Sequence, residues 1–263
     1  HWDTSAFQNK FKSIPGYGTY TTVEVIREAG RLVYSGMKDG FAKGGYTNLL
    51  VTIGDHELGD NPWPAGTTVS QQLPAFREGF ADIFNKHSAG GAYIHTNMIG
   101  TAAGRPYGTV FEETSYAVQH KNVLFVTVDI FHQQGPNVTI GPAGTVLGEL
   151  VGDHLSWFTN VLAQANSIAS IKHIIVQSHL PGIYPVRKYA SSGMLLTNNG
   201  NSNFFNAMRQ YGVDIYMGGE VHGNTVALDP ASDLVQLVTR GNGGSNPTIF
   251  DVEDNRIYIE TYK

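Results

Sequence analysis

One stretch near the middle of the N-terminal half constrains this chain most strongly. Residues 49–53 are mostly apolar and partly β-branched, and the run ends at Gly54. Three ionisable side chains, Asp55, His56 and Glu57, follow directly. A buried strand that ends in glycine and then places carboxylate and imidazole groups in a loop is how α/β proteins build a site at the carboxyl edge of a sheet. The stretch therefore predicts an α/β fold with functional residues at a strand end.

Helical and strand patterns alternate through the first two thirds of the chain, and strands alone close it. The apolar spacing predicts helices over residues 22–43, 74–87, 145–165 and 204–211. Apolar runs predict strands over residues 49–53, 115–119, 122–130, 171–177 and 213–217, with a hairpin turn at His120-Lys121. Four alternating segments, residues 225–228, 234–239, 248–252 and 256–262, predict a β-meander, and residues 1–20 predict a loop. Without a repeat or a linker, residues 1–263 are expected to form a single domain with helices outside a β-sandwich.

The composition excludes several classes of protein. Of the 263 residues, 41% are hydrophobic, which is enough for a substantial core, and none is cysteine, which excludes disulfides and thiolate chemistry. The net charge is −5 and no cluster of Lys and Arg exceeds two residues, which argues against nucleic acid as a partner. No apolar run approaches about 18 residues, so no membrane span is predicted. Only 15% of the residues are charged, and this, with the richness in Gly, Asn and Thr, indicates a secreted, periplasmic or cell-surface protein.

Histidines and carboxylates follow three of the predicted strands. His56 follows the first, His179 follows residues 171–177, and Glu220 and His222 follow residues 213–217. A single histidine after a strand is usually an ordinary polar loop residue. If these strands are parallel neighbours, however, their carboxyl ends lie side by side, and imidazole and carboxylate groups from adjacent loops can hold a divalent metal. The remaining histidines show no such pattern and are interpreted as surface or core residues.

The order and context of these motifs resemble the calcineurin-like metallophosphoesterases, which include the purple acid phosphatases. Gly54-Asp55-His56-Glu57 matches the family's Gly-Asn-His-Asp/Glu motif, and His179 matches its lone histidine after a strand. Gly219-Glu220-Val221-His222 matches its Gly-His-x-His motif. The resemblance covers roughly residues 47–262. It implies a four-layer α/β/β/α sandwich that is truncated at its N-terminus in this chain.

The resemblance also implies an activity and a division of roles. The expected function is metal-dependent hydrolysis of a small phosphate ester, as a phosphatase or phosphodiesterase with two divalent cations (Mn, Fe, Zn, Mg or Ca). Asp55, His179 and His222 match metal ligands, and Glu220 is expected to be one as well. His56 matches the family's proton donor, and Glu57 would orient its imidazole.

Two residues depart from the family pattern. Asp55 stands where the family has Asn, and Glu220 stands where it has the first histidine of the last motif. Both changes add anionic oxygen, which favours harder cations such as Mn, Mg or Ca over Zn, or else they mark a decayed site.

The family's first two motifs are not seen intact. Placing Gly-Asp before His1-Trp2-Asp3 would complete the second of them. One hypothesis is therefore that the chain starts just inside this motif, and that an upstream segment or another chain completes the site. The competing interpretation is a Trp-containing N-terminal loop without such a history.

Two further interpretations stay open at this point. The chain could be a non-catalytic exported or surface structural protein with a degenerate metallophosphoesterase fold. It could also be a metal-binding or sugar-binding β-sandwich module in which the motifs are fortuitous. A serine hydrolase is disfavoured, because the sequence has no Gly-x-Ser-x-Gly elbow.

Overall fold

The computed structural model describes residues 2–58, 72–95, 99, 104–132, 147–184, 196–221, 223–239 and 247–261. The chain divides into two compact units. The first contains residues 1–96 and 133–146, and the second contains residues 97–132 and 147–263. Each unit is described by itself below, and the single domain over residues 1–263 stays a prediction.

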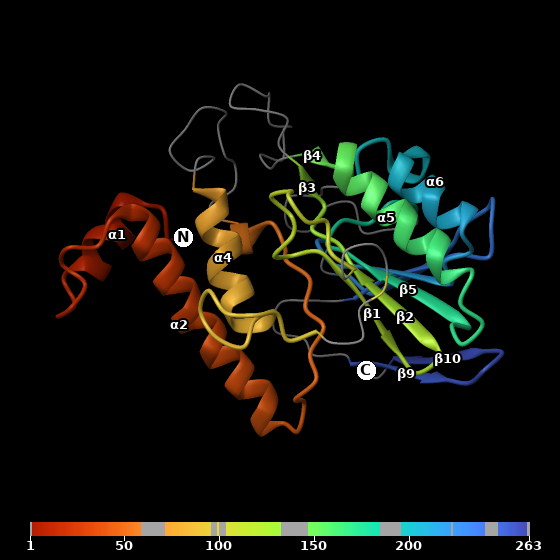
Figure 1. The fold of residues 1–263 in the computed structure, drawn as a ribbon, viewed down its shortest axis with the longest axis horizontal. Coiled ribbons are helices and arrows are strands. Elements are labelled where there is room, and N and C mark those ends of the chain that lie inside the picture. The colour runs from red at the N-terminus through yellow and green to blue at the C-terminus, as the bar shows by residue number, and fades with distance from the viewer. Residues whose placement is uncertain are drawn as a thin grey trace. The chain divides into compact units, whose positions relative to one another are not determined.

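The first unit is built on a long helix, α2 (Thr22–Lys43), shown in Figure 1. Thr21 and Glu24 form a capping box at its start, in which the Thr21 hydroxyl accepts the Glu24 N–H and the Glu24 carboxylate accepts the Thr21 N–H. Gly44 caps its end. The unit also contains α1 (Ser5–Lys12), α4 (Leu73–Phe84) and the short 3₁₀ helix η1 (His56–Leu58). The predictions for residues 22–43 and 74–87 are therefore confirmed, the second to within a few residues.

The loop predicted for residues 1–20 is wrong, because α1 lies within it. The Thr4 hydroxyl caps this helix by accepting the Phe7 N–H at 3.3 Å. Phe7 and Phe11 are four residues apart and share one face, and Phe11 packs in a cluster with Val25 and Ala29 of α2. Eight residues contain too few apolar positions to show a period, so the helix depends on this packing against α2.

A second expectation, a strand over residues 49–53, is not met, because the structure assigns no strand there. Ile53 is nevertheless fully buried, as is Leu58 just beyond it. A short apolar run predicts burial, and the type of backbone structure does not follow from it.

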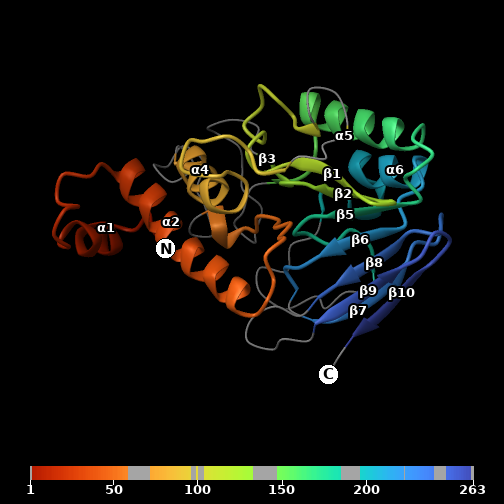
Figure 2. The same cartoon turned by 60° about the horizontal axis from the view of Figure 1, so that its bottom comes forward.

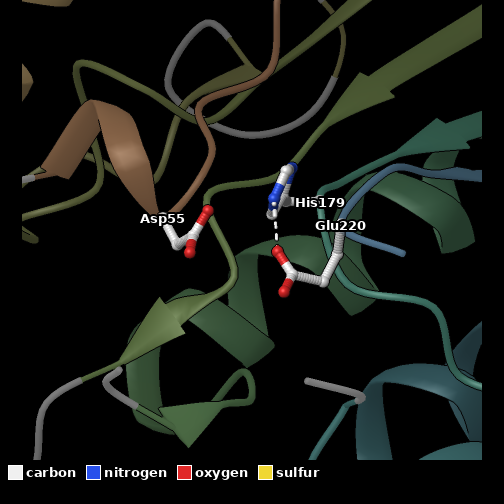
Figure 3. Close-up of side chains that lie close together, drawn as sticks. All are labelled: Asp55, His179 and Glu220. Atoms are coloured by element: carbon white, nitrogen blue, oxygen red, sulfur yellow. Dashed lines mark hydrogen bonds and ion pairs between the residues drawn. The ribbon is translucent and has the colours of Figure 1, made fainter. Parts of the chain in front are cut away.

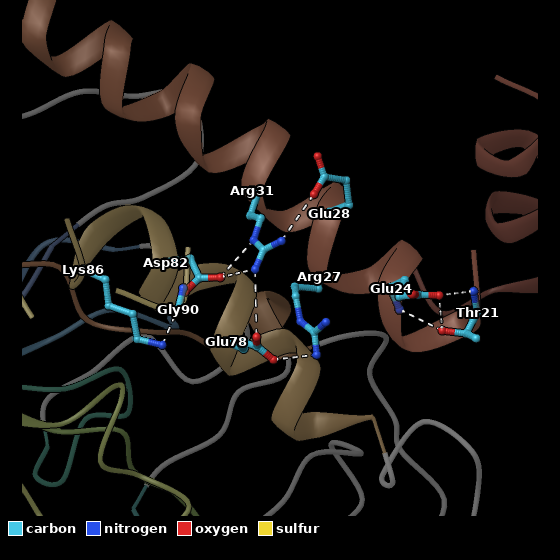
Figure 4. Close-up of polar contacts among 9 residues, drawn as sticks. All are labelled: Thr21, Glu24, Arg27, Glu28, Arg31, Glu78, Asp82, Lys86 and Gly90. Carbon is cyan, nitrogen blue, oxygen red and sulfur yellow. Dashed lines mark hydrogen bonds and ion pairs between the residues drawn. The ribbon is translucent and has the colours of Figure 1, made fainter. Parts of the chain in front are cut away.

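A polar network joins α2 to α4 and has Asp82 at its centre (Figure 4). The Asp82 side chain is fully buried, and its carboxylate accepts hydrogen bonds from Arg31 Nε at 2.9 Å and from the Gly90 N–H at 2.9 Å. The Lys86 ammonium lies 3.3 Å away. Burial acts to raise the pKa of Asp82, but these hydrogen bonds and positive charges outweigh it, so the pKa of this carboxyl lies below its ordinary value.

The second unit contains a six-stranded mixed sheet in the order β1-β2-β5-β6-β8-β7 (Figure 2). Its strands are β1 (Tyr116–His120), β2 (Val123–Thr127), β5 (His173–Gln177), β6 (Ile215–Gly218), β7 (Thr225–Leu228) and β8 (Val235–Val238). The pairs β2–β5, β5–β6 and β6–β8 are parallel, whereas β1 and β7 pair antiparallel at the two edges. Two small ladders join β3 (Phe131–His132) to β4 (Leu147–Gly148) and β9 (Thr248–Val252) to β10 (Ile257–Thr261).

The two faces of this sheet are covered differently. The helices α5 (Gly152–Ala165) and α6 (Asn203–Gln210) lie on one side of the sheet in both views (Figures 1 and 2). On this side, Phe204 and Phe205 of α6 contact the Tyr216 ring. On the other face, Phe250 and Val252 of the β9–β10 hairpin pack against a cluster that contains Ile215. These layers confirm the α/β class, while the four-layer sandwich stays a prediction.

Three features predicted from the sequence fall in the second unit: a hairpin, a helix and a β-meander. The hairpin at His120-Lys121 is confirmed, but the helix predicted from residue 145 begins only at Gly152, because β4 precedes it. The β-meander is met only in part, because β7 pairs with β8 and β9 pairs with β10, but the two pairs belong to different sheets. The strand β7 lies at the edge of the six-stranded sheet, and its Val226 and Leu228 side chains are 66% and 65% exposed. The four segments alternate similarly in sequence, so the pattern does not tell which of them share a sheet.

The polar network predicts a destabilising effect of Asp82→Asn. Asparagine leaves the partly buried charge of Arg31 without its carboxylate, so the free energy of unfolding should fall by about 3–5 kcal/mol in urea denaturation at pH 7. Because the folded pKa of Asp82 is lowered, its contribution is present above the unfolded pKa of about 3.9 and is lost as the pH falls through the folded value. The matched control Asp39→Asn, at an exposed position of α2, should stay within about 0.5 kcal/mol. An equally small effect of Asp82→Asn would contradict the structural role of this network.

Candidate metal centre

The parallel pairing of β5 with β6 brings two loops to one edge of the sheet. His179 lies two residues beyond the end of β5, and Glu220 lies two residues beyond the end of β6. The register pairs Gln177 with Met217, so the two strands end at the same level. The expectation that parallel neighbours place their carboxyl ends side by side is therefore confirmed for this pair.

His179 and Glu220 are in direct contact in the second unit. Their atoms Nε2 and Oε2 lie 3.0 Å apart, as the dashed line in Figure 3 marks. The Glu220 side chain is 1% exposed and that of His179 is 21% exposed, so a buried carboxylate faces an imidazole with access to solvent. Two ligands that each lie about 2.1 Å from one cation and subtend about 90–110° are about 3.0–3.4 Å apart. The separation of these two atoms fits a shared cation as well as a hydrogen bond.

Glycine makes the close approach of the two loops feasible. The Gly219 N–H donates to the His179 carbonyl at 2.8 Å. A Cβ atom on Gly219 would lie 3.2 Å from Nδ1 of the His179 imidazole, which is tighter than an ordinary contact. The absence of a side chain at Gly219 therefore leaves room for the His179 ring.

Glu220 has an unusual backbone conformation. Its φ is +49°, in the left-handed region that non-glycine residues rarely adopt. Such a conformation costs on the order of 1–3 kcal/mol and persists where the surroundings enforce it, which is often at a functional site. The conformation aims the Glu220 carboxylate at His179, since Oε2 reaches the imidazole.

The Asp-His-Glu run belongs to the first unit. Asp55 is 1% exposed, and the following η1 helix begins at His56, whose side chain is 54% exposed. His56 Nε2 lies 3.9 Å from Asp55 Oδ2, and the Glu57 carboxylate accepts the Gly54 N–H at 2.9 Å. Glu57 thus fixes the turn that ends the apolar run, and its expected orientation of the His56 imidazole stays a prediction.

Two of the four predicted ligands, His179 and Glu220, meet within the second unit (Figure 3). Asp55 belongs to the first unit, and its role as a third ligand stays a prediction. The fourth, His222, lies outside the described residues. A carboxylate and an imidazole that face each other suit a divalent cation by their chemistry.

The sequence reasoning missed a further carboxylate at the same edge. Asp129 lies two residues beyond β2, the parallel neighbour of β5, and is fully buried. Its carboxylate accepts hydrogen bonds from the Thr114 hydroxyl at 2.7 Å and the Phe131 N–H at 3.1 Å. The sequence does contain a sign of this carboxylate, because Asp129 interrupts the apolar run from Val123 to Phe131.

Comparisons with known proteins add little to this geometry. No protein-family model matches the chain, and no curated protein matches it. A solved structure described as "GAP50 the anchor in the inner membrane complex of Plasmodium" is similar at 14% sequence identity and a TM-score of 0.34. That match covers 88% of this chain and 73% of the other, but a TM-score this low carries no argument. In the described part of the chain, no helix has the length and apolar character needed to cross a membrane.

The close contact at Gly219 can be tested without any ligand. In Gly219→Ala, the new methyl group must displace the His179 ring, so the imidazole ¹H and ¹³C NMR signals of His179 should shift and the protein should lose about 1 kcal/mol of stability. Gly36→Ala is the matched control, because a Cβ at Gly36 meets open space within α2. Unchanged His179 signals in Gly219→Ala would contradict the described packing.

Proposed function

We propose that this protein is a metal-dependent phosphoric ester hydrolase, a phosphatase or phosphodiesterase that acts on small phosphate esters. The observation that carries the proposal is the His179–Glu220 pair, 3.0 Å apart at the ends of two adjacent parallel strands. A buried carboxylate against an imidazole at this edge supplies two ligands of the kinds that divalent cations bind.

The donor set determines which cation the site would prefer. We assign His179 and Glu220 as ligands, with Asp55 as the third and His222 as a further one. Two carboxylates supply hard anionic oxygen, which favours Mn or Mg over Zn, although the imidazole also suits Fe and Zn. In the proposed dinuclear centre, the bound cations would offset the charge of the phosphate and lower the pKa of water.

His56 is proposed as the proton donor to the leaving oxygen. Its side chain is 54% exposed and follows Asp55 directly, so it is accessible to a substrate while its neighbour acts as a ligand. Glu57 holds the backbone at Gly54 and so positions the turn that carries His56.

The finer architecture and the location also belong to this proposal. The fold would be a four-layer α/β/β/α sandwich. The low proportion of charged residues favours a secreted, periplasmic or cell-surface protein.

Metal binding is tested first, on the full chain with added Mn²⁺. His179→Ala and Glu220→Gln each remove one ligand, so the Mn²⁺ affinity measured by calorimetry should fall at least about tenfold, as for other changes in a metal's ligand environment. His120→Ala replaces an exposed histidine at the end of β1 and should leave the affinity unchanged. If His179→Ala binds Mn²⁺ as the native protein does, the ligand assignment is wrong.

Catalysis is tested by hydrolysis of a chromogenic phosphate ester in the presence of Mn²⁺. His56→Ala should lower turnover by about 10²–10⁴, because a general acid of this kind contributes that much, while Mn²⁺ binding is retained. His120→Ala again serves as the control with native turnover. Mn²⁺ binding by the native chain without any hydrolysis would contradict the enzymatic proposal and favour a non-catalytic surface protein.

A further inference from the structure

The His179 imidazole packs against the ring of Phe131, which belongs to the same unit. The two ring centroids lie 5.9 Å apart, and the ring planes are tilted by 45°. The space beside Nδ1 is bounded by Gly219, where a Cβ atom would lie 3.2 Å from it. Nε2 has to face the Glu220 carboxylate if the two side chains are to share a cation. The contacts that orient this imidazole therefore control whether the pair can form.

The position of Phe131 depends on the turn that follows β2. Phe131 begins β3, whose two residues pair with Leu147 and Gly148 of β4. A two-stranded ladder is marginally stable on its own, and this one has only two residues in each strand. The chain between β2 and β3 therefore needs a further constraint to keep the Phe131 ring against His179.

The Asp129 side chain supplies such a constraint. Its carboxylate accepts the Phe131 N–H at 3.1 Å, which is the turn that an aspartate forms with the backbone two residues on. The other carboxylate oxygen accepts the Thr114 hydroxyl at 2.7 Å, and the Asp129 N–H donates to the Ser115 hydroxyl oxygen at 2.9 Å. Thr114, Ser115 and Asp129 are all fully buried. The turn is therefore tied to the segment that leads into β1.

The surroundings of Asp129 are themselves fixed. The Ser115 hydroxyl oxygen lies 3.0 Å from Nε2 of His154, a buried residue of α5. The Val128 N–H donates to the Gln177 carbonyl at 2.9 Å, which extends the β2–β5 ladder as far as the residue before Asp129. A buried carboxylate is costly unless it is hydrogen-bonded, and the hydrogen bonds of Asp129 are the ones that fix this turn.

We propose that Asp129 is a positioning residue, which orients the His179 imidazole toward Glu220 by holding the Phe131 ring against it. Removing a group that supports a ligand imidazole typically lowers metal affinity by about 10–100-fold. For cation binding the inference rests on the proposed function, because it needs His179 to be a ligand. The orientation of the ring itself needs no cation, so it can be measured on the metal-free chain.

The test begins with NMR of the metal-free full chain, and its readout is the NOE between the ring protons of Phe131 and the imidazole protons of His179. This NOE should be present in the native chain and lost in Asp129→Ala, which removes the acceptor of the Phe131 N–H. Asp129→Asn should retain it, because asparagine keeps an oxygen for this N–H and its amide can donate to the Thr114 hydroxyl. With Mn²⁺, calorimetry should show an affinity at least about tenfold lower for Asp129→Ala, and within about twofold of the native value for Asp129→Asn.

Asp214→Ala is the matched control. The Asp214 carboxylate also accepts a backbone N–H, that of Ile174 at 2.8 Å, but at the opposite end of β5. This variant should keep both the NOE and the native Mn²⁺ affinity. If Asp129→Ala does not fold, Phe131→Leu replaces it, because leucine keeps apolar bulk but removes the ring. The His179 imidazole signals of Phe131→Leu should broaden as the imidazole samples more than one orientation.

The proposal is overturned if the NOE persists in a folded Asp129→Ala, or if the His179 imidazole signals of Phe131→Leu stay as sharp as in the native chain. A tenfold loss of Mn²⁺ affinity in Asp129→Asn with the NOE retained would also overturn it, because the negative charge of Asp129 would then act directly. If the native chain binds no Mn²⁺, the cation site of the proposed function is refuted, and the metal-free measurements still decide the role of Asp129.

Discussion

The parallel pairing of β2, β5 and β6 is the constraint on which the account of this protein depends. Parallel neighbours end at the same edge, so the residues that follow β5 and β6 are brought together although about forty positions separate them. At that edge, His179 meets the Glu220 carboxylate, and Gly219 allows the close approach of the two loops. The helices α5 and α6 cover one face of the sheet and keep its apolar strands out of water.

Much of this arrangement was predictable from the sequence, because the signals were local and strong. The 22-residue helix α2 has a helical period and a capping box, and β2 and β5 are continuous apolar runs typical of buried parallel strands. The positions of His179 and Glu220 followed from those strands. Their 3.0 Å separation needed the structure, because the pairing of β5 with β6 is a long-range property.

The features that the sequence analysis did not predict also depend on long-range packing. The helix α1 is too short to show a period and depends on Phe11 packing against α2. The four C-terminal strands form two antiparallel pairs in different sheets, and the sequence pattern of the four is alike, so it could not show where one sheet ends and the other begins. Asp129 was overlooked because a single aspartate in an apolar run is typical of a strand end, and only the sheet order places it beside β5.

The central claim is that the edge formed by β5 and β6 is a cation site. A crystal structure of the full chain soaked in MnCl₂, with anomalous diffraction recorded at the manganese edge, tests it most directly. The account predicts an anomalous peak within about 2.0–2.3 Å of both His179 Nε2 and Glu220 Oε2. A map with no peak there, and with the His179–Glu220 hydrogen bond intact at millimolar Mn²⁺, would contradict it.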